Sequence, residues 1–162
     1  MAKTPLDADG LLDTEDTVIV AARLAYPEYS VNSVYICQAN RSFRPRLTRL
    51  GFYADKQIKP EVPAILSRPQ NVLFTEEEAK RREVGDDPAG RVVAKIIRLN
   101  LAEATRELGS VHDLFILSAK TDSRTLVLRQ PVHHRSKGAW TQGQRYTSEK
   151  GLASATTTDD LQ

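Results

Sequence analysis

Four arginines within nine residues are the first feature of this sequence that suggests chemistry. They lie in the stretch 34–54, VYICQANRSFRPRLTRLGFYA, which contains no acidic residue, and they are Arg41, Arg44, Arg46 and Arg49. A guanidinium fork fits phosphate oxygens, and an aromatic ring offers a stacking surface that any base can use. Because Phe43 stands between the arginines, the stretch predicts a surface that binds a nucleic acid.

A second basic segment, residues 124–150, repeats this composition. It carries six lysines and arginines and two histidines, and Glu149 is its only acid. If the fold brings the two segments together, they form one patch for a polyanion in a chain whose net charge is only +2. The candidate nucleic-acid-binding residues of this segment are Arg135, Lys137, Trp140, Arg145 and Tyr146.

The first basic segment also has a purely structural interpretation. Residues 1–33 carry six acids and two bases, so the arginines could instead pair with this acidic segment while Phe43 covers one end of the core. The sequence leaves both interpretations open. In either case Pro45 and the turn-forming Asn40 and Ser42 indicate a loop between two strands rather than a regular helix.

Catalytic motifs are weak by comparison. The eight glycines do not have the spacing of a phosphate loop, and Cys37 lies in an apolar strand, where a cysteine is usually a buried hydrophobic residue. The adjacent His133 and His134 would point to opposite faces of a strand, which does not favour a metal site. We therefore expect binding without catalysis, with no catalytic residue, no metal and no cofactor.

Two other functions remain as alternatives. Glu78 and Lys80 have the Glu-x-Lys spacing of many metal-dependent nucleases, and Asp113 and Asp122 could add carboxylates for a cation next to a phosphate. However, Glu78 falls in a charged segment that reads as a helix rather than a strand. The other alternative is a protein-interaction module whose basic loop meets an acidic partner.

The length, composition and cysteine count of the chain indicate one domain in a reducing compartment. Hydrophobic residues make up 40% of the chain, and no apolar run approaches the roughly 20 residues that span a bilayer. The N-terminus lacks the apolar segment of a secretory signal, and a single cysteine fits a reducing environment. We expect a cytoplasmic protein that contacts no membrane, with an acidic tail at 1–16, a globular domain at 17–150 and a C-terminal tail at 151–162. The oligomeric state stays open.

Strand signals outnumber helix signals between the tails. The turn-like KTDS at 120–123 predicts a hairpin between its two flanking strands. Runs rich in β-branched and aromatic residues predict strands at 17–24, 34–39, 50–54, 71–74, 91–99, 112–119, 124–130 and 139–147.

Three short helices complete the expected set. Thr75 and Glu78 form a capping-box pattern at the start of a helix at 75–83, and further helices are expected at 100–109 and 60–66. Strands that do not alternate with long helices exclude a doubly wound parallel sheet. The sequence therefore predicts an α+β fold, a small, partly closed, mainly antiparallel β-barrel of about seven or eight strands with two or three short helices.

The order of these elements resembles the PUA-like group of small barrels, which includes the ASCH and EVE domains. The features that carry the resemblance are LGFYADKQI (50–58), a strand that ends in Phe-Tyr before a polar turn, and GRVVAKIIRLN (90–100), a long later strand. It covers most of 17–150. Families of this group bind RNA or DNA, and some hold a flipped or modified base in an aromatic-lined cleft. The resemblance implies that Tyr53, Trp140 or Tyr146 lines a base pocket.

Overall fold

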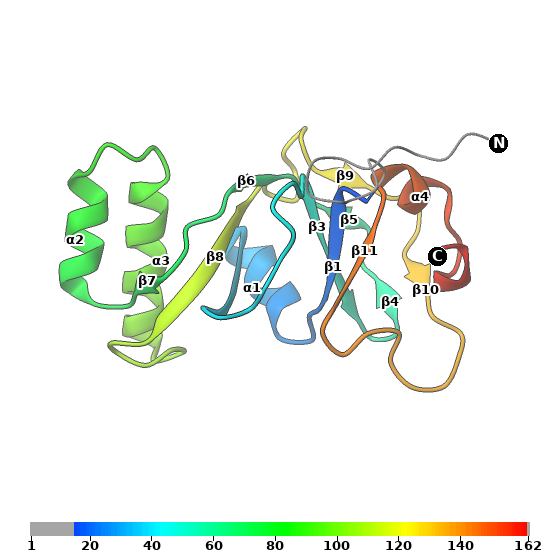
Figure 1. The fold of residues 1–162 in the computed structure, drawn as a ribbon, viewed down its shortest axis with the longest axis horizontal. Helices are drawn as coiled ribbons and strands as arrows, with labels where there is room; N and C mark the ends of the chain where they lie inside the picture. Colours follow the sequence, from blue (N-terminus) through cyan, green and yellow to red (C-terminus); the bar gives the residue numbers. More distant parts are fainter. Residues whose placement is uncertain (1–14, 162) are drawn as a thin grey trace.

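Two β-sheets and one pair of short strands organise residues 15–161, the part of the chain that the computed structural model describes (Figure 1). The strands are β1 (Thr17–Ala21), β2 (Val34–Gln38), β3 (Arg49–Ala54), β4 (Gln57–Ile58), β5 (Glu61–Val62), β6 (Ile65–Ser67), β7 (Val72–Leu73), β8 (Val111–Leu117), β9 (Leu126–Val127), β10 (Val132–His133) and β11 (Gln144–Thr147). The helices are α1 (Ala25–Asn32), α2 (Glu76–Val84), α3 (Gly90–Glu103), α4 (Glu149–Ser154) and the short 3₁₀ helix η1 (Thr158–Asp160). The predicted α+β class is confirmed.

The larger sheet curls but does not close. Its five strands run in the order β10-β4-β3-β1-β11, so that β10 and β11 are its two ends. β1 and β3 are parallel, and the other neighbours are antiparallel. For the described residues, the expected single, partly closed barrel of about seven or eight mainly antiparallel strands is therefore replaced by a curled sheet of five strands. The reason is that β2 and β8 form a separate sheet, and that one expected strand is a helix.

Strands β2 and β8 of the second sheet are buried on both faces. β8 pairs with β2 on one side and with β6 and β7 on the other. Tyr35 and Phe115 face the larger sheet, where Tyr35 packs edge-on against Phe52 of β3. Burial of both faces explains the continuous apolar runs of β2 and β8. The residues on the face that α2 and α3 cover are Val34, Ile36, Leu114 and Ile116.

The segment 91–99, expected as a strand, belongs to α3. Its buried positions follow the helical spacing i, i+1, i+3, i+4 and i+7, and they are Val93, Ala94, Ile96, Ile97 and Asn100. The β-branched residues suggested a strand, but this apolar stripe packs against α2 and the second sheet only if the segment is a helix.

Three other expectations are also wrong. The helix at 100–109 does not form, because α3 ends at Glu103 and Ala104 adopts a left-handed conformation with φ 54°. The segment 60–66 contains β5 and β6 instead of a helix, with Pro63 between the two strands. The hairpin of 112–119 and 124–130 is replaced by separate pairings, because β8 already has neighbours on both sides and β9 pairs with β5.

Several local predictions are confirmed. The strands at 34–39, 50–54 and 71–74 correspond to β2, β3 and β7. The helix at 75–83 is α2, and the Thr75 hydroxyl accepts a hydrogen bond from the Glu78 N–H at 3.1 Å. The strands at 17–24 and 139–147 are present but shorter, as β1 and β11.

The C-terminal segment, expected as a tail, is part of the core as far as residue 161. Leu152 of α4 and Leu161 pack against Ile19, Ile58 and Val132. The sequence does contain a signal for helix α4, which the prediction of a tail did not use. It is the N-cap residue Ser148, whose hydroxyl accepts a hydrogen bond from the Gly151 N–H at 2.8 Å. Of the expected N-terminal tail, only residues 15 and 16 lie within the described residues. None of the described helices combines the length and the apolar character that crossing a membrane requires.

Candidate functional site

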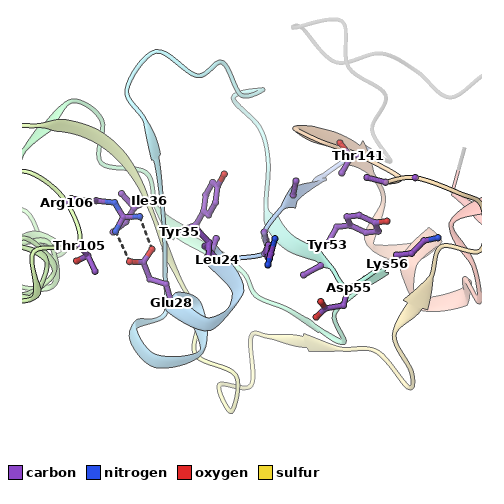
Figure 2. A pocket seen from close by; sticks show the side chains of 17 residues that line it. Leu24, Glu28, Tyr35, Ile36, Tyr53, Asp55, Lys56, Thr105, Arg106 and Thr141 are labelled. Atoms are coloured by element: carbon purple, nitrogen blue, oxygen red, sulfur yellow. Dashed lines mark hydrogen bonds and ion pairs between the residues drawn. The ribbon is translucent and has the colours of Figure 1, made fainter.

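A cleft of about 1000 Å³ opens where the two sheets diverge (Figure 2). We call it the tyrosine cleft, because Tyr35 of β2 and Tyr53 of β3 both line it. Figure 2 shows Glu28, Ile36 and Arg106 at one end and Asp55, Lys56 and Thr141 at the other. The cleft therefore lies between the α1–β2 unit and the end of β3.

Small side chains create this space. The alanines that line the tyrosine cleft are Ala21, Ala22, Ala25, Ala54 and Ala139. Within the described residues β2 pairs with β8 alone, so its other edge faces the cleft instead of another strand. In the β2–β8 register Leu117 N–H donates to Ser33 O, which directs the N–H and C=O of Ile36 toward that open edge. The cleft wall thus offers backbone donors and acceptors besides apolar surface.

The two tyrosines are fixed by hydrogen bonds to their hydroxyl groups. Tyr35 accepts a hydrogen bond from Nη1 of Arg41, and Tyr53 accepts one at 3.0 Å from the backbone N–H of Trp140. Burial raises the pKa of Tyr35 to about 12, so its hydroxyl stays neutral at physiological pH. Both rings are fixed and almost buried, 4% and 5% exposed, so they form a rigid floor of the cleft.

The rim of the tyrosine cleft carries more positive than negative charge. Its cations are Arg23, Lys56 and Arg106, and its acids are Glu28 and Asp55. Arg106 is paired with Glu28 at 2.7 Å, which fixes the loop after α3 to α1. Lys56 donates to the carbonyl oxygen of Ser136 at 2.6 Å, and Arg23 is exposed. The positive charge of Arg23 and Lys56 remains available to an anionic ligand.

A second hollow, of about 510 Å³, continues the cleft along β2. We call it the glutamine hollow, because Gln38, Gln142 and Gln144 line it. It shares Tyr35 and Ile36 with the tyrosine cleft and adds polar groups that can read the edge of a base. Together the two hollows form one groove along the open edge of β2.

The two basic segments of the sequence adjoin beside this groove. Arg41 donates from Nε to Oε1 of Gln144 at 2.8 Å, and Gln144 donates to the carbonyl oxygen of Ser42 at 2.7 Å. The guanidinium carbon of Arg44 lies 4.0 Å from the centre of the Tyr146 ring. Loop 39–48 and β11 are thus joined by direct contacts, and the structure brings these parts of the two segments together.

The arginines of the first segment differ in their partners. Arg44 forms an ion pair with Glu15. Arg49 pairs with Glu149 at 3.1 Å and donates to the carbonyl oxygens of Val62 and Arg124. Arg46 is exposed. The pairing with the acidic N-terminal segment that the sequence left as an alternative therefore occurs at Arg44, next to its stacking contact with Tyr146, whereas Arg49 pairs with an acid of the second basic segment.

Phe43 faces the core rather than solvent. It is half-buried, and its ring lies edge-on to Phe115 with a centroid distance of 5.0 Å. The guanidinium carbon of Arg41 lies 5.0 Å from the centre of the Phe43 ring. Phe43 thus supports Arg41 in the free protein.

The second segment places its aromatic residues next to Tyr53. Trp140 packs against Tyr53 with a centroid distance of 5.9 Å, and the guanidinium carbon of Arg145 lies 4.4 Å from the Trp140 ring. Arg135 and Lys137 are exposed in the connection between β10 and β11. This connection forms part of the cleft rim through Gly138, Ala139 and Thr141.

Several residues of the groove were not expected from the sequence. They are Arg23, Tyr35, Lys56 and Arg106. Arg23, Lys56 and Arg106 lie outside the two basic segments, whereas Tyr35 lies within the first. Tyr35 read as a strand residue, and it is one. Its position at an unpaired edge depends on which strands become neighbours, and the sequence pattern of β2 does not contain that information.

The carboxylates considered for a nuclease lie on separate elements. Glu78 is paired with Arg81 at 2.6 Å on α2, and Asp122 is paired with Arg124 at 2.8 Å in the turn after β8. Asp113 of β8 accepts a hydrogen bond from the Asn71 N–H at 2.8 Å. Within residues 15–161, no group of three or more His, Cys, Asp or Glu side chains could hold a metal ion.

Comparisons of the chain with family models, with curated proteins and with solved structures gave no match. The resemblance to the PUA-like group therefore stays a prediction.

Proposed function

We propose that the protein binds nucleic acid without catalysing a reaction, with the strand backbone on the joined basic segments and a base in the tyrosine cleft. The observation that carries this proposal is the contact between the two basic segments beside a groove with aromatic walls. Stacking of one base on an aromatic side chain contributes about 1–3 kcal/mol, and the joined cations add a term that depends on salt. The PUA-like resemblance and the expected cytoplasmic location are consistent with the proposal and remain part of it.

The pairing of Arg44 and Arg49 with acids changes the expected role of these residues. A paired arginine attracts a phosphate less, because a nearby carboxylate offsets its charge. We therefore expect the exposed Arg23, Arg135 and Lys137 to make most of the phosphate contacts. Tyr35 and Tyr53 are 4% and 5% exposed, so we expect them to form the floor under a bound base, and Trp140 supports Tyr53.

Filling the tyrosine cleft tests the proposal. Ala139→Trp adds a large ring at an exposed lining residue, so we expect it to weaken binding of single-stranded oligonucleotides by about tenfold or more without loss of stability. The matched control is Ala153→Trp at an exposed position of α4. Fluorescence anisotropy with labelled single-stranded and duplex DNA and RNA, each titrated at several salt concentrations, measures both effects.

The same experiment decides between the proposal and its alternatives. Absence of binding to all four probes at low salt would refute the proposal, and equal weakening by both tryptophan variants would remove the cleft from it. Cleavage of a probe after addition of a divalent cation would favour the nuclease.

An acidic, extended peptide is a second candidate ligand, because the open edge of β2 could accept a strand beside Arg23 and Lys56. Poly-glutamate that binds more tightly than any oligonucleotide would favour it.

A further inference from the structure

A third hollow, of about 250 Å³, shares Arg41 with the glutamine hollow. We call it the arginine hollow, because Arg41 and Arg68 both line it. The rest of its polar lining consists of Asn40, Ser42, Gln70, Asn71 and Asp113. The volume is small for a base with its sugar and large enough for a phosphate group with water.

Both guanidinium groups are held by neutral acceptors within residues 15–161. Arg68 donates from Nη1 to the carbonyl oxygens of Arg44 at 2.8 Å and Pro45 at 3.3 Å. Arg41 donates to Oε1 of Gln144 and to the hydroxyl of Tyr35. These contacts fix the positions of the two cations without neutralising them, which is the arrangement that a phosphate requires of a binding site.

A pair of phenylalanine rings orients the same two arginines. The guanidinium carbon of Arg68 lies 4.8 Å from the centre of the Phe115 ring, and that of Arg41 lies 5.0 Å from the centre of Phe43. Because Phe43 and Phe115 are in edge-on contact with each other, each arginine stacks on one ring of a single aromatic pair. Their donor groups are therefore preorganised, and little side-chain entropy remains to be lost on binding.

The electrostatic cost of this arrangement is visible at Arg68. Partial burial lowers the pKa of the Arg68 guanidinium, because removal from water disfavours the charged form. An anion in the arginine hollow would offset this cost.

One carboxylate opposes an anion in the arginine hollow. Asp113 is 9% exposed, and its Oδ1 accepts a hydrogen bond from the backbone N–H of Asn71 at 2.8 Å. The lining still carries two cations against one acid. Substitution of Asp113 should have the opposite effect to substitution of the arginines. Asn at this position keeps the shape and the acceptor oxygen of the side chain and removes only its negative charge.

We propose that the arginine hollow binds a phosphate group and that, in a nucleic-acid complex, it holds a strand phosphate next to the groove along β2. Only the second half of this statement rests on the proposed function. Arg41 links the two sites physically, because it lines both the arginine hollow and the glutamine hollow.

The test is a titration with inorganic phosphate at constant ionic strength, with chloride as the exchanged anion. NMR signals of the arginine Nε–H groups report binding, and circular dichroism confirms that each variant is folded. Arg41→Gln and Arg68→Gln should each weaken phosphate binding by about tenfold, since each removes a charge-assisted hydrogen bond. The matched control is Arg91→Gln, which removes the same charge from an exposed position of α3 and should leave phosphate binding unchanged.

Asp113→Asn separates a charge effect from a structural one. It should strengthen phosphate binding, whereas damage to the hollow would weaken it. A wild-type protein that does not respond to phosphate, or a response that is equal in Arg68→Gln and Arg91→Gln, would overturn the proposal.

Oligonucleotide binding in the anisotropy assay separates the two proposals. Phosphate binding without oligonucleotide binding would leave the phosphate site in place and refute the proposed function. Oligonucleotide binding without a response to inorganic phosphate would support the proposed function and refute the phosphate site.

Discussion

The Cys37 side chain lies on the inner face of the second sheet, 7% exposed, with its Sγ 3.7 Å from the carbonyl oxygen of Asp113. Burial raises the pKa of the Cys37 thiol to about 11, because the thiolate is poorly solvated there. Arg41 acts in the opposite direction but does not compensate for burial. This residue therefore lacks the accessible, hydrated environment of a nucleophilic cysteine.

A reagent that attacks thiolates provides a test of this conclusion. At about pH 8 a thiol with a pKa of about 11 is deprotonated in only about one molecule in a thousand, so native protein should react very slowly with a disulfide reagent. The same protein should react fully in urea, which serves as the control. Rapid reaction of the native protein would show that Cys37 is accessible and activated.

The arginines illustrate what the sequence could not resolve at the scale of residues. The clustering of Arg41, Arg44, Arg46 and Arg49 predicted a basic loop, and the structure places the first three between β2 and β3 and Arg49 at the start of β3. The clustering did not predict which of the four arginines form ion pairs. The partners Glu15 and Glu149 lie 29 and 100 residues away from Arg44 and Arg49 in the chain. Arg68 was missed for the same reason, since its partners are backbone carbonyls of a distant loop.

At the scale of elements, α2 and α3 pack so closely that a side chain at Gly90 has no space. A Cβ atom there would lie 2.1 Å from the carbonyl oxygen of Arg82, well inside van der Waals contact. Gly90→Ala must therefore displace one helix relative to the other. We expect it to lower the free energy of unfolding by about 1–3 kcal/mol, the usual cost of overpacking.

Urea unfolding followed by circular dichroism measures this loss. The control is Gly143→Ala, because a Cβ at Gly143 has no neighbouring atom within 4 Å among the described residues. Equal stability of the two variants would show that the α2–α3 packing tolerates a shift at no cost.

Elements with strong local signals were predictable, and those that depend on pairing were not. α2 was found because its cap and charges lie within nine consecutive residues, and β2 and β3 because both are short apolar runs between turns. α3 was misread because Val and Ile content outweighed a helical spacing that was also present in the sequence. The pairing of β9 with β5 joins residues that are 64 and 66 positions apart in the chain, and it has no local signal.

At the scale of the whole molecule, the three hydrophobic clusters found within residues 15–161 are connected through shared strands. The two sides of the second sheet belong to different clusters, with Tyr35 in one and Ile36 in the next. Strand β1 links the first cluster to the third. Its Val18 and Val20 belong to the first cluster, and its Ile19 belongs to the third, which also contains Leu152. Because no cluster can lose its packing without exposing a strand that another cluster needs, we expect residues 15–161 to unfold as one cooperative unit.

Leu152→Ala tests this cooperativity. Leu152 is 1% exposed, so its truncation should cost about 2–5 kcal/mol, whereas Leu108→Ala at a 74% exposed position should cost little. Trp140 fluorescence reports on the cluster of Leu152, and far-UV circular dichroism is dominated by α2 and α3 at the other end of the molecule. If the clusters are coupled as the shared strands indicate, Leu152→Ala shifts both unfolding curves by the same amount. A shift in fluorescence alone would show that the α2–α3 end unfolds independently, and the groove between the sheets would then join two separately stable parts.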